Sequence, residues 1–198
     1  MSNDLFKNKY RILSARLKGW DYRSNGAYFI TICTKNRKHY FGEITDNKMV
    51  LSNIGIIADI LWHEIKNHTK NVDLDAFVVM PNHIHGIVVI NKPDNFDDGV
   101  RCRDEACLVS TTTTTNVTNN NDNKNQFMSS ISPKSGSISV IIGSYKSAFT
   151  RNAHRLGFEF VWQVRFHDHI IRNTTEYKRI FDYIIENPEK WNDDNFFD

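Results

Sequence analysis

Residues 74–90 read LDAFVVMPNHIHGIVVI, and this stretch decides the fold. Two apolar runs rich in β-branched residues, 74–80 and 83–90, flank Pro81–Asn82, and proline followed by asparagine supplies turn chemistry. We therefore expect two consecutive strands joined by a tight turn, which together form the centre of a sheet.

The sequence on either side predicts further strands and amphipathic helices. Strands or hairpins are expected at 27–34, 41–52 and 161–171, and helices at 54–65, 137–157 and 173–187. The last helix has an expected apolar face of Tyr177, Ile180, Phe181, Ile184 and Ile185. Its expected cap pairs Asn173 with Glu176, and Pro188 ends it. This order predicts an α+β fold of the ferredoxin-like kind: a split βαβ antiparallel sheet with two crossover helices and an extra C-terminal helix.

Composition is that of a globular protein. The 198 residues are 40% hydrophobic and 24% charged, which excludes a wholly disordered chain, a collagen and a coiled coil. No stretch is long and apolar enough to span a bilayer, and the first residues do not read as a secretory signal. The sparse, odd set of Cys33, Cys102 and Cys107 argues against a disulfide framework, so we expect a cytoplasmic protein.

A low-complexity segment interrupts the expected fold. Between about 93 and 135, apolar residues are few, and Thr111–Thr115 is followed by an asparagine-rich run. We expect a disordered insertion within a single domain of residues 1–198.

Charge is unevenly distributed along the chain. The first forty residues hold nine Lys or Arg against two Asp, although the net charge of the whole chain is only +2. A basic segment of this kind suggests a polyanionic partner, but on charge alone a solvated surface is the preferred interpretation.

The histidines near the central turn are the strongest chemical signal. Side chains alternate along a strand, so His83 and His85 share one face while Ile84 anchors the other. Neutral imidazoles bind divalent transition metals, and two of them leave coordination positions open. Local hydrogen bonding on a half-buried sheet face is the alternative. His167 and His169 also share a face, but Asp168 between them is a poor core anchor, so we expect this pair to line the same cleft.

The last helix offers a partner for these histidines. At about 100° per residue, Tyr183 lies to one side of the apolar stripe centred on Tyr177, and Asn187 follows one turn later on the same side. A nucleophilic phenol and an amide ligand at a metal site fit this pattern. So do an ordinary exposed aromatic and a helix-terminal asparagine.

The chain as a whole resembles the single-tyrosine transposases of the HUH superfamily, of the insertion-sequence-200-like type, in the branch of the REP-associated tyrosine transposases. The residues that carry the resemblance are AYFITICTKNR (27–37), FGEI (41–44), VVMPNHIHGIV (78–88), SYKSAF (144–149), VWQ (161–163), DHIIRN (168–173) and DYIIENPEKW (182–191). The match covers nearly the whole chain except the insertion.

The resemblance implies a site and a chemistry. His83 and His85 would bind a divalent metal ion, Mg²⁺ or Mn²⁺, with Asn187 as the third ligand where compact relatives carry glutamine. Tyr183 would attack a phosphate of single-stranded DNA and form a 5′-phosphotyrosyl link, so no ATP is needed.

The resemblance also implies a nucleic-acid partner. The DNA would have hairpin-forming ends or repeats, and the expected backbone contacts come from Arg16, Lys18, Arg37, Lys146 and Arg151. Relatives of this type include homodimers and monomers, which leaves both states open.

Two other functions remain open on the sequence. One is a catalytically inactive DNA-binding module of the same fold. The other is a metal-dependent hydrolase of a small phosphoester, with His83, His85 and the 167–169 pair as ligands. The sequence has no P-loop, no dinucleotide-binding glycine pattern and no G-x-S-x-G, so ATP-driven and nicotinamide chemistry have no support.

Overall fold

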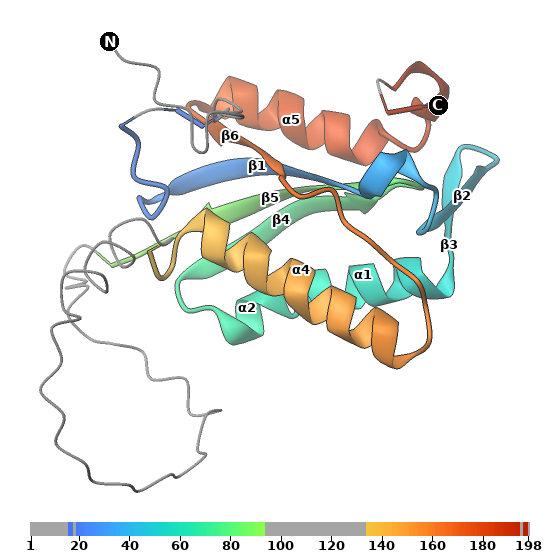
Figure 1. The fold of residues 1–198 in the computed structure, drawn as a ribbon. Coiled ribbons are helices and arrows are strands. Elements are labelled where there is room, and N and C mark those ends of the chain that lie inside the picture. Colours follow the sequence, from blue (N-terminus) through green and yellow to red (C-terminus); the bar gives the residue numbers. More distant parts are fainter. Residues whose placement is uncertain (1–15, 18, 94–133, 195, 198) are drawn as a thin grey trace, which may run out of the picture.

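The computed structural model describes residues 16–17, 19–93, 134–194 and 196–197 (Figure 1). The expected insertion at 93–135 therefore lies almost entirely outside the described residues, as do Lys18, Cys102 and Cys107.

A four-stranded antiparallel sheet forms the centre of the protein. Its strands, in spatial order, are β4 (Val72–Val79), β5 (His83–Ile90), β1 (Gly26–Cys33) and β6 (His167–Ile171). β1 and β5 therefore lie side by side at the centre of the sheet, and β4 and β6 form its edges. The predicted α+β, ferredoxin-like arrangement is confirmed.

The turn between β4 and β5 forms at Pro81–Asn82, as the sequence predicts. The backbone NH of Met80 donates to the carbonyl of His83 at 2.9 Å and closes the turn. The carbonyl of Pro81 accepts from the NH of Phe41 at 3.1 Å, and that of Asn82 accepts from Thr34 at 2.9 Å. These bonds join the N-terminal end of β5 to the segment that follows β1.

Helices α1 (Asn53–His63) and α4 (Ile138–Arg155) cover one face of the sheet (Figure 1). Ser52 caps α1 by accepting from the NH of Gly55 at 3.1 Å. The short helix α2 (Ile65–His68) follows α1. The predicted apolar stripe of α4 is confirmed, since Ile138, Ile141, Ile142, Tyr145 and Phe149 are all buried.

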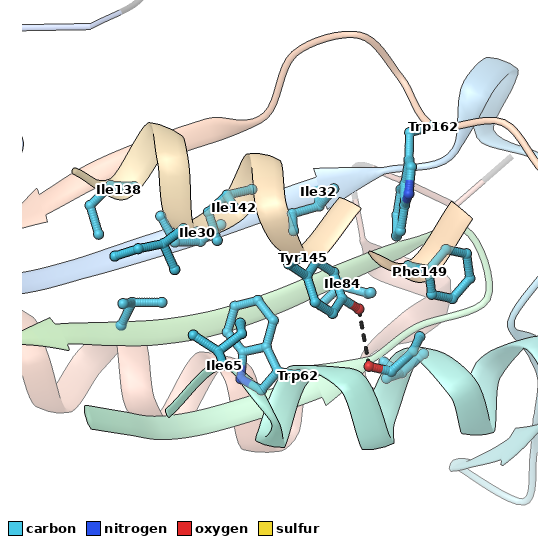
Figure 2. Close-up of a cluster of buried hydrophobic side chains, with 14 of the residues drawn as sticks. Ile30, Ile32, Trp62, Ile65, Ile84, Ile138, Ile142, Tyr145, Phe149 and Trp162 are labelled. Carbon is cyan, nitrogen blue, oxygen red and sulfur yellow. Dashed lines mark hydrogen bonds between the residues drawn. The ribbon is translucent and has the colours of Figure 1, made fainter. Parts of the chain in front are cut away.

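Aromatic packing fills the core on this face (Figure 2). The Tyr145 hydroxyl donates to the Ala58 carbonyl at 3.0 Å, which satisfies the polar end of a buried ring. Trp62 lies against the backbone of Gly86, where an added Cβ would sit 2.3 Å from the indole ring. Glycine is required at position 86 because the indole occupies the space of a side chain.

Helix α5 (Thr174–Glu186) covers the opposite face of the sheet (Figure 1). Asn173 caps it by accepting from the NH of Glu176 at 2.8 Å, as predicted. Ile180 and Ile184 are buried against Ile87 of β5. The expected place of Ile185 in this face is wrong: its side chain is 54% exposed, because it lies beyond the edge of the contact with the sheet.

The predicted strand at 161–171 is too long. Only His167–Ile171 pairs along β1, whereas Trp162 makes a single bridge to Thr34 and buries its ring in the main core. Between these two places, the NH of Gln163 donates to the carbonyl of Cys33 at 2.9 Å, and Phe166 packs against the main core.

A hairpin and two 3₁₀ turns lie at the end of the sheet where β5 begins. A hairpin is formed by β2 (Gly42–Thr45) and β3 (Lys48–Leu51), and its turn is made by Asp46 and Asn47 with positive φ. The 3₁₀ turns η2 (Lys35–Arg37) and η3 (Trp191–Asp193) follow β1 and α5. In the part of the chain that the structure describes, no helix is long and apolar enough to cross a membrane.

Candidate active site

The histidines of β5 lie on the sheet face that α5 covers. His83 and His85 pair with Cys33 and Thr31 of β1, and both side chains are buried, with 0% and 1% exposure. Ile84 points to the other face and belongs to the main core, as the alternation predicts. The rings of His83 and His85 lie 4.4 Å apart, centre to centre.

Hydrogen bonds decide which ring nitrogen of His83 carries its proton. The amide nitrogen of Asn82 donates to the carbonyl of Phe196 at 2.8 Å, so the amide oxygen of Asn82 faces His83 Nδ1, also at 2.8 Å. That oxygen only accepts, and Nδ1 must therefore be the protonated nitrogen. Nε2 then presents a lone pair, and it is buried without a hydrogen-bond partner.

His85 is oriented in a similar way. Its Nδ1 lies 2.9 Å from the hydroxyl of Thr31, and its Nε2 lies 3.2 Å from the hydroxyl of Tyr183. Burial holds the pKa of both histidines below the ordinary range, that of His83 at about 3, so both rings are neutral near pH 7. Neutral rings fixed through Nδ1, with Nε2 turned toward the site, are the form that metal ions require.

Tyr183 projects from α5 toward this pair. Its side chain is 41% exposed, with the ring edge-on to Phe29 and the hydroxyl at His85. Burial of the hydroxyl end, and then the Asp194 carboxylate, raise the pKa of the phenol to about 12. Tyr177 packs into the core under α5, and its hydroxyl bonds Asp75. The structure thus separates the two tyrosines as the helical spacing predicts.

Asn187 joins the same cluster. It is the C-terminal cap of α5 and is 2% exposed. Its amide nitrogen donates to Asp194 Oδ2 at 2.8 Å, while its amide oxygen is buried without a partner.

Asp194 is the site residue that sequence reasoning missed. One nitrogen each from His83 and His85 and one carboxylate oxygen of Asp194 lie within 4.8 Å of one another, a cluster that could hold a metal ion. Asp194 lies in an acidic C-terminal tail with no periodic pattern, and no sequence signal distinguishes it from Asp193. The side chains of Trp191 and Phe196, which pack on the His83 ring at 5.9 and 4.5 Å, bring it to the site.

The donor set fits a divalent metal ion. Within the described part of the chain, the buried lone pairs of His83 Nε2 and Asn187 Oδ1 have no hydrogen-bond partner, although an unmet buried polar atom is costly. Imidazole nitrogens together with amide and carboxylate oxygens are donors that divalent metal ions accept.

The second histidine pair is not part of this cluster. His167 and His169 lie on the same sheet face, since His167 pairs with Thr31 and His169 with Phe29. His169 bonds Glu176 at 2.8 Å, at the N-terminal end of α5. Asp168 points to the opposite face, where its carboxylate pairs with Arg16 at 3.2 Å.

The candidate DNA-binding residues fall into separate places. Arg37 stacks over Phe196. Burial raises the pKa of the Cys33 thiol to about 11, and the nearby positive charges of Arg37 and the half-buried Lys146 lower it in part. Lys146 and Arg151 line a shallow depression with Trp162. Arg16 lies apart from the site, where it bonds Asp168 and Ser139 near the start of α4.

Comparison with known proteins gives relatives along nearly the whole chain. A protein of Haemophilus influenzae is 33% identical over 188 residues, which cover 93% of this chain and 92% of the relative. The REP-associated tyrosine transposase of Escherichia coli K12 is 47% identical over 45 residues, 23% of this chain and 26% of that protein. No protein-family model matches the chain.

Solved structures share the fold. A REP-associated tyrosine transposase bound to a REP hairpin superposes with a TM-score of 0.53 at 22% identity, covering 90% of this chain and 74% of that one. The chain therefore belongs to one family with the Haemophilus influenzae protein, and its resemblance to the HUH single-tyrosine transposases of the REP-associated branch is confirmed.

Proposed function

We propose that the protein is a metal-dependent DNA nicking and strand-transfer enzyme of the transposase type, with Tyr183 as its nucleophile. The observation that carries the proposal is the contact between the Tyr183 hydroxyl and His85 Nε2 at 3.2 Å, beside two buried lone pairs that no group of the described residues satisfies. A nucleophile next to a place for a Lewis acid is the arrangement that phosphoryl transfer needs.

The chemistry is a reversible exchange of phosphodiester bonds. The Tyr183 oxygen attacks a backbone phosphorus of single-stranded DNA, the bond to the 3′ oxygen breaks, and that oxygen leaves as a hydroxyl. The DNA 5′ end is then esterified to Tyr183, and attack by a 3′-hydroxyl restores the backbone. The bond energy is kept in the phosphotyrosyl ester, so the exchange requires no ATP.

The phenol must lose its proton as the new bond forms. Its pKa of about 12 means that it is protonated near pH 7. His85 Nε2 lies 3.2 Å from the hydroxyl in the metal-free protein, and Asp194 Oδ2, at 3.5 Å, is the acceptor that remains when an ion occupies His85 Nε2. A divalent ion held by His83, His85 and Asn187 would polarise the scissile phosphate and stabilise charge on its oxygens.

The proposed substrate is single-stranded DNA next to a hairpin. The solved relative is bound to a REP hairpin, and we carry this partner over to the present chain. Arg37, Lys146 and Arg151 are the proposed phosphate contacts, with Arg16 and Lys18 as further candidates. Contacts of this kind position the strand without reading its sequence.

Adduct formation tests the proposal. Wild type, Tyr183→Phe and the matched control Tyr177→Phe are incubated with labelled single-stranded oligonucleotides tiled across both flanks of the gene, with Mn²⁺, with Mg²⁺ or with chelator. We expect a metal-dependent covalent band on a denaturing gel for wild type and Tyr177→Phe. Tyr183→Phe should give none.

Two results would contradict the proposal. An undiminished adduct in Tyr183→Phe would refute the nucleophile. DNA binding without an adduct under any condition would favour the inactive binding module.

We also propose that residues 1–198 form one catalytic domain whose insertion is dispensable for folding. The two ends of the insertion lie close together, since a Cβ on Gly136 would be 4.0 Å from Lys92 Nζ. Lys92 is itself held by two hydrogen bonds to the Asn25 side chain at 2.8 Å. A short linker replacing residues 95–132 should therefore leave a cooperative unfolding transition, and loss of that transition would show that the insertion is structural.

A further inference from the structure

We propose that Asp194 is a fourth protein ligand of the divalent ion, beside His83, His85 and Asn187. This inference rests on the proposed function, because it concerns the same site, and it adds a residue from outside the recognised motifs. Two ligand atoms on opposite sides of one ion are about 4.2 Å apart, from metal–ligand distances of about 2.1 Å. The ligand atoms of His83, His85 and Asp194 all lie within 4.8 Å of one another, so without an ion their separations are already close to this distance.

Charge compensation is the first reason to include Asp194. The other three groups are two neutral imidazoles and an amide, so without a carboxylate the protein would offer a buried dication no negative charge. Among the described residues, Asp194 is the acid that lies within ligand distance of the two histidines. A hard cation in a mostly buried site is held far better by a carboxylate than by neutral donors alone.

The carboxylate of Asp194 has a free acceptor position. Its Oδ1 accepts from the NH of Phe196 at 2.8 Å, and its Oδ2 accepts from the amide of Asn187 at 2.8 Å. Oδ2 also accepts from the Tyr183 hydroxyl at 3.5 Å, so of the two lone pairs that each oxygen carries, one on Oδ1 is left for a metal ion. The bond to Asn187 also fixes the amide so that its oxygen, not its nitrogen, is the atom left without a partner.

The segment that carries Asp194 is anchored on the site by several independent contacts. Trp191 is buried; it packs edge-on against His39 and with tilted rings against His83. Phe196 packs on the His83 ring, and its carbonyl accepts from Asn82, the same residue that orients His83. These contacts lie on both sides of Asp194 in the chain, so they hold it beside the histidines.

Direct Mn²⁺ binding, measured by calorimetry on the full-length protein without DNA, tests the assignment. Asp194→Asn keeps the size of the side chain and an acceptor for the Asn187 amide but removes the charge. We expect it to weaken Mn²⁺ binding at least about tenfold. The matched control is Asp193→Asn, an exposed neighbour with the same change of charge, which should bind like wild type.

Two further measurements keep the result interpretable. Electron paramagnetic resonance should still detect imidazole nitrogen coupled to Mn²⁺ in Asp194→Asn at saturating metal, since both histidines remain. Asp194→Ser is the second variant if the asparagine variant fails to fold. A folded Asp194 variant that binds Mn²⁺ within twofold of wild type would overturn the inference, as would a wild type that binds no Mn²⁺.

The two proposals fail in different ways. If wild type forms the Tyr183 adduct while Asp194→Asn binds Mn²⁺ normally, only the fourth ligand is refuted. If Asp194→Asn loses Mn²⁺ affinity while wild type forms no adduct with any oligonucleotide, the metal site stands and the proposed strand transfer is refuted.

Discussion

The hydroxyl of Tyr183 lies 3.2 Å from Nε2 of His85, although 98 residues separate the two in the chain. The contact crosses from the exposed edge of α5 to a buried strand. It occupies the same nitrogen lone pair that a metal ion at this site would use, because Nδ1 of His85 is held by Thr31 at 2.9 Å. The phenol and the ion therefore compete for His85.

This competition predicts the effect of removing the hydroxyl. Tyr183→Phe should abolish the covalent adduct but bind Mn²⁺ at least as tightly as wild type, with a gain of up to about tenfold, because a neutral hydrogen bond contributes roughly 0.5–1.5 kcal/mol. Calorimetry without DNA measures this. A Tyr183→Phe affinity well below that of wild type would mean that the phenol oxygen is itself a ligand.

Acid should destabilise the metal-free protein through the buried histidines. Burial lowers the pKa of His83 from its ordinary 6.5 to about 3, so between these values the unfolded chain takes up a proton that the folded chain does not. The contribution of His83 to stability is therefore present above pH 6.5 and is lost as the pH falls toward 3, at up to about 1.4 kcal/mol per pH unit.

Urea unfolding at a series of pH values checks this prediction. His83→Asn retains a donor for Asn82 and does not titrate, so its stability should fall less steeply below pH 6.5 than that of wild type. The same substitution at the exposed His63 is the control and should follow wild type. Equal slopes for wild type and His83→Asn would contradict the prediction.

Two cations on α4 should contribute to DNA binding through phosphate contacts. Lys146 and Arg151 line one depression with Trp162, and Lys146 is held in place there by the carbonyl of Gln163 at 2.6 Å. Each alanine substitution should weaken single-stranded DNA binding and reduce the slope of log affinity against log salt by about 0.7. Fluorescence anisotropy at several salt concentrations measures both quantities. Lys66→Ala on α2 is the control, and a slope unchanged by both site substitutions would remove this face from the proposed DNA path.

Replacing glycine by alanine should have opposite effects on stability at two positions. Gly86→Ala would place a Cβ 2.3 Å from the Trp62 ring, so it should destabilise the protein by about 1–3 kcal/mol. Gly143 lies in α4 with nothing within 4 Å of an added Cβ, so Gly143→Ala should stabilise it by about 0.5–1 kcal/mol. Urea denaturation at pH 7 compares them. A Gly86→Ala variant as stable as wild type would show that the indole can move aside.

Local patterns in the sequence determined most of the fold. Alternation along 83–90 decides which face holds His83 and His85, and helical spacing separates Tyr183 from Tyr177; both follow from fixed backbone periodicities. The cap at Asn173 and the turn at Pro81–Asn82 are equally local. The local patterns were wrong at 161–166 and at Ile185, where tertiary contacts decide the structure. Trp162 packs in the core and makes only a single bridge instead of continuing a strand. The contact of α5 with the sheet ends before Ile185.

The composition of the site depended on the tertiary structure. Periodicity places His85 on one face of its strand and Tyr183 to one side of the apolar stripe of its helix. Only the packing of α5 across β5 brings the Tyr183 hydroxyl to 3.2 Å from His85 Nε2. Asp194 shows the limit most clearly, because nothing in the acidic tail sets it apart from Asp193. It reaches the histidines because Trp191 and Phe196 dock on the His83 ring, and contacts between residues distant in sequence leave no periodic trace in the chain.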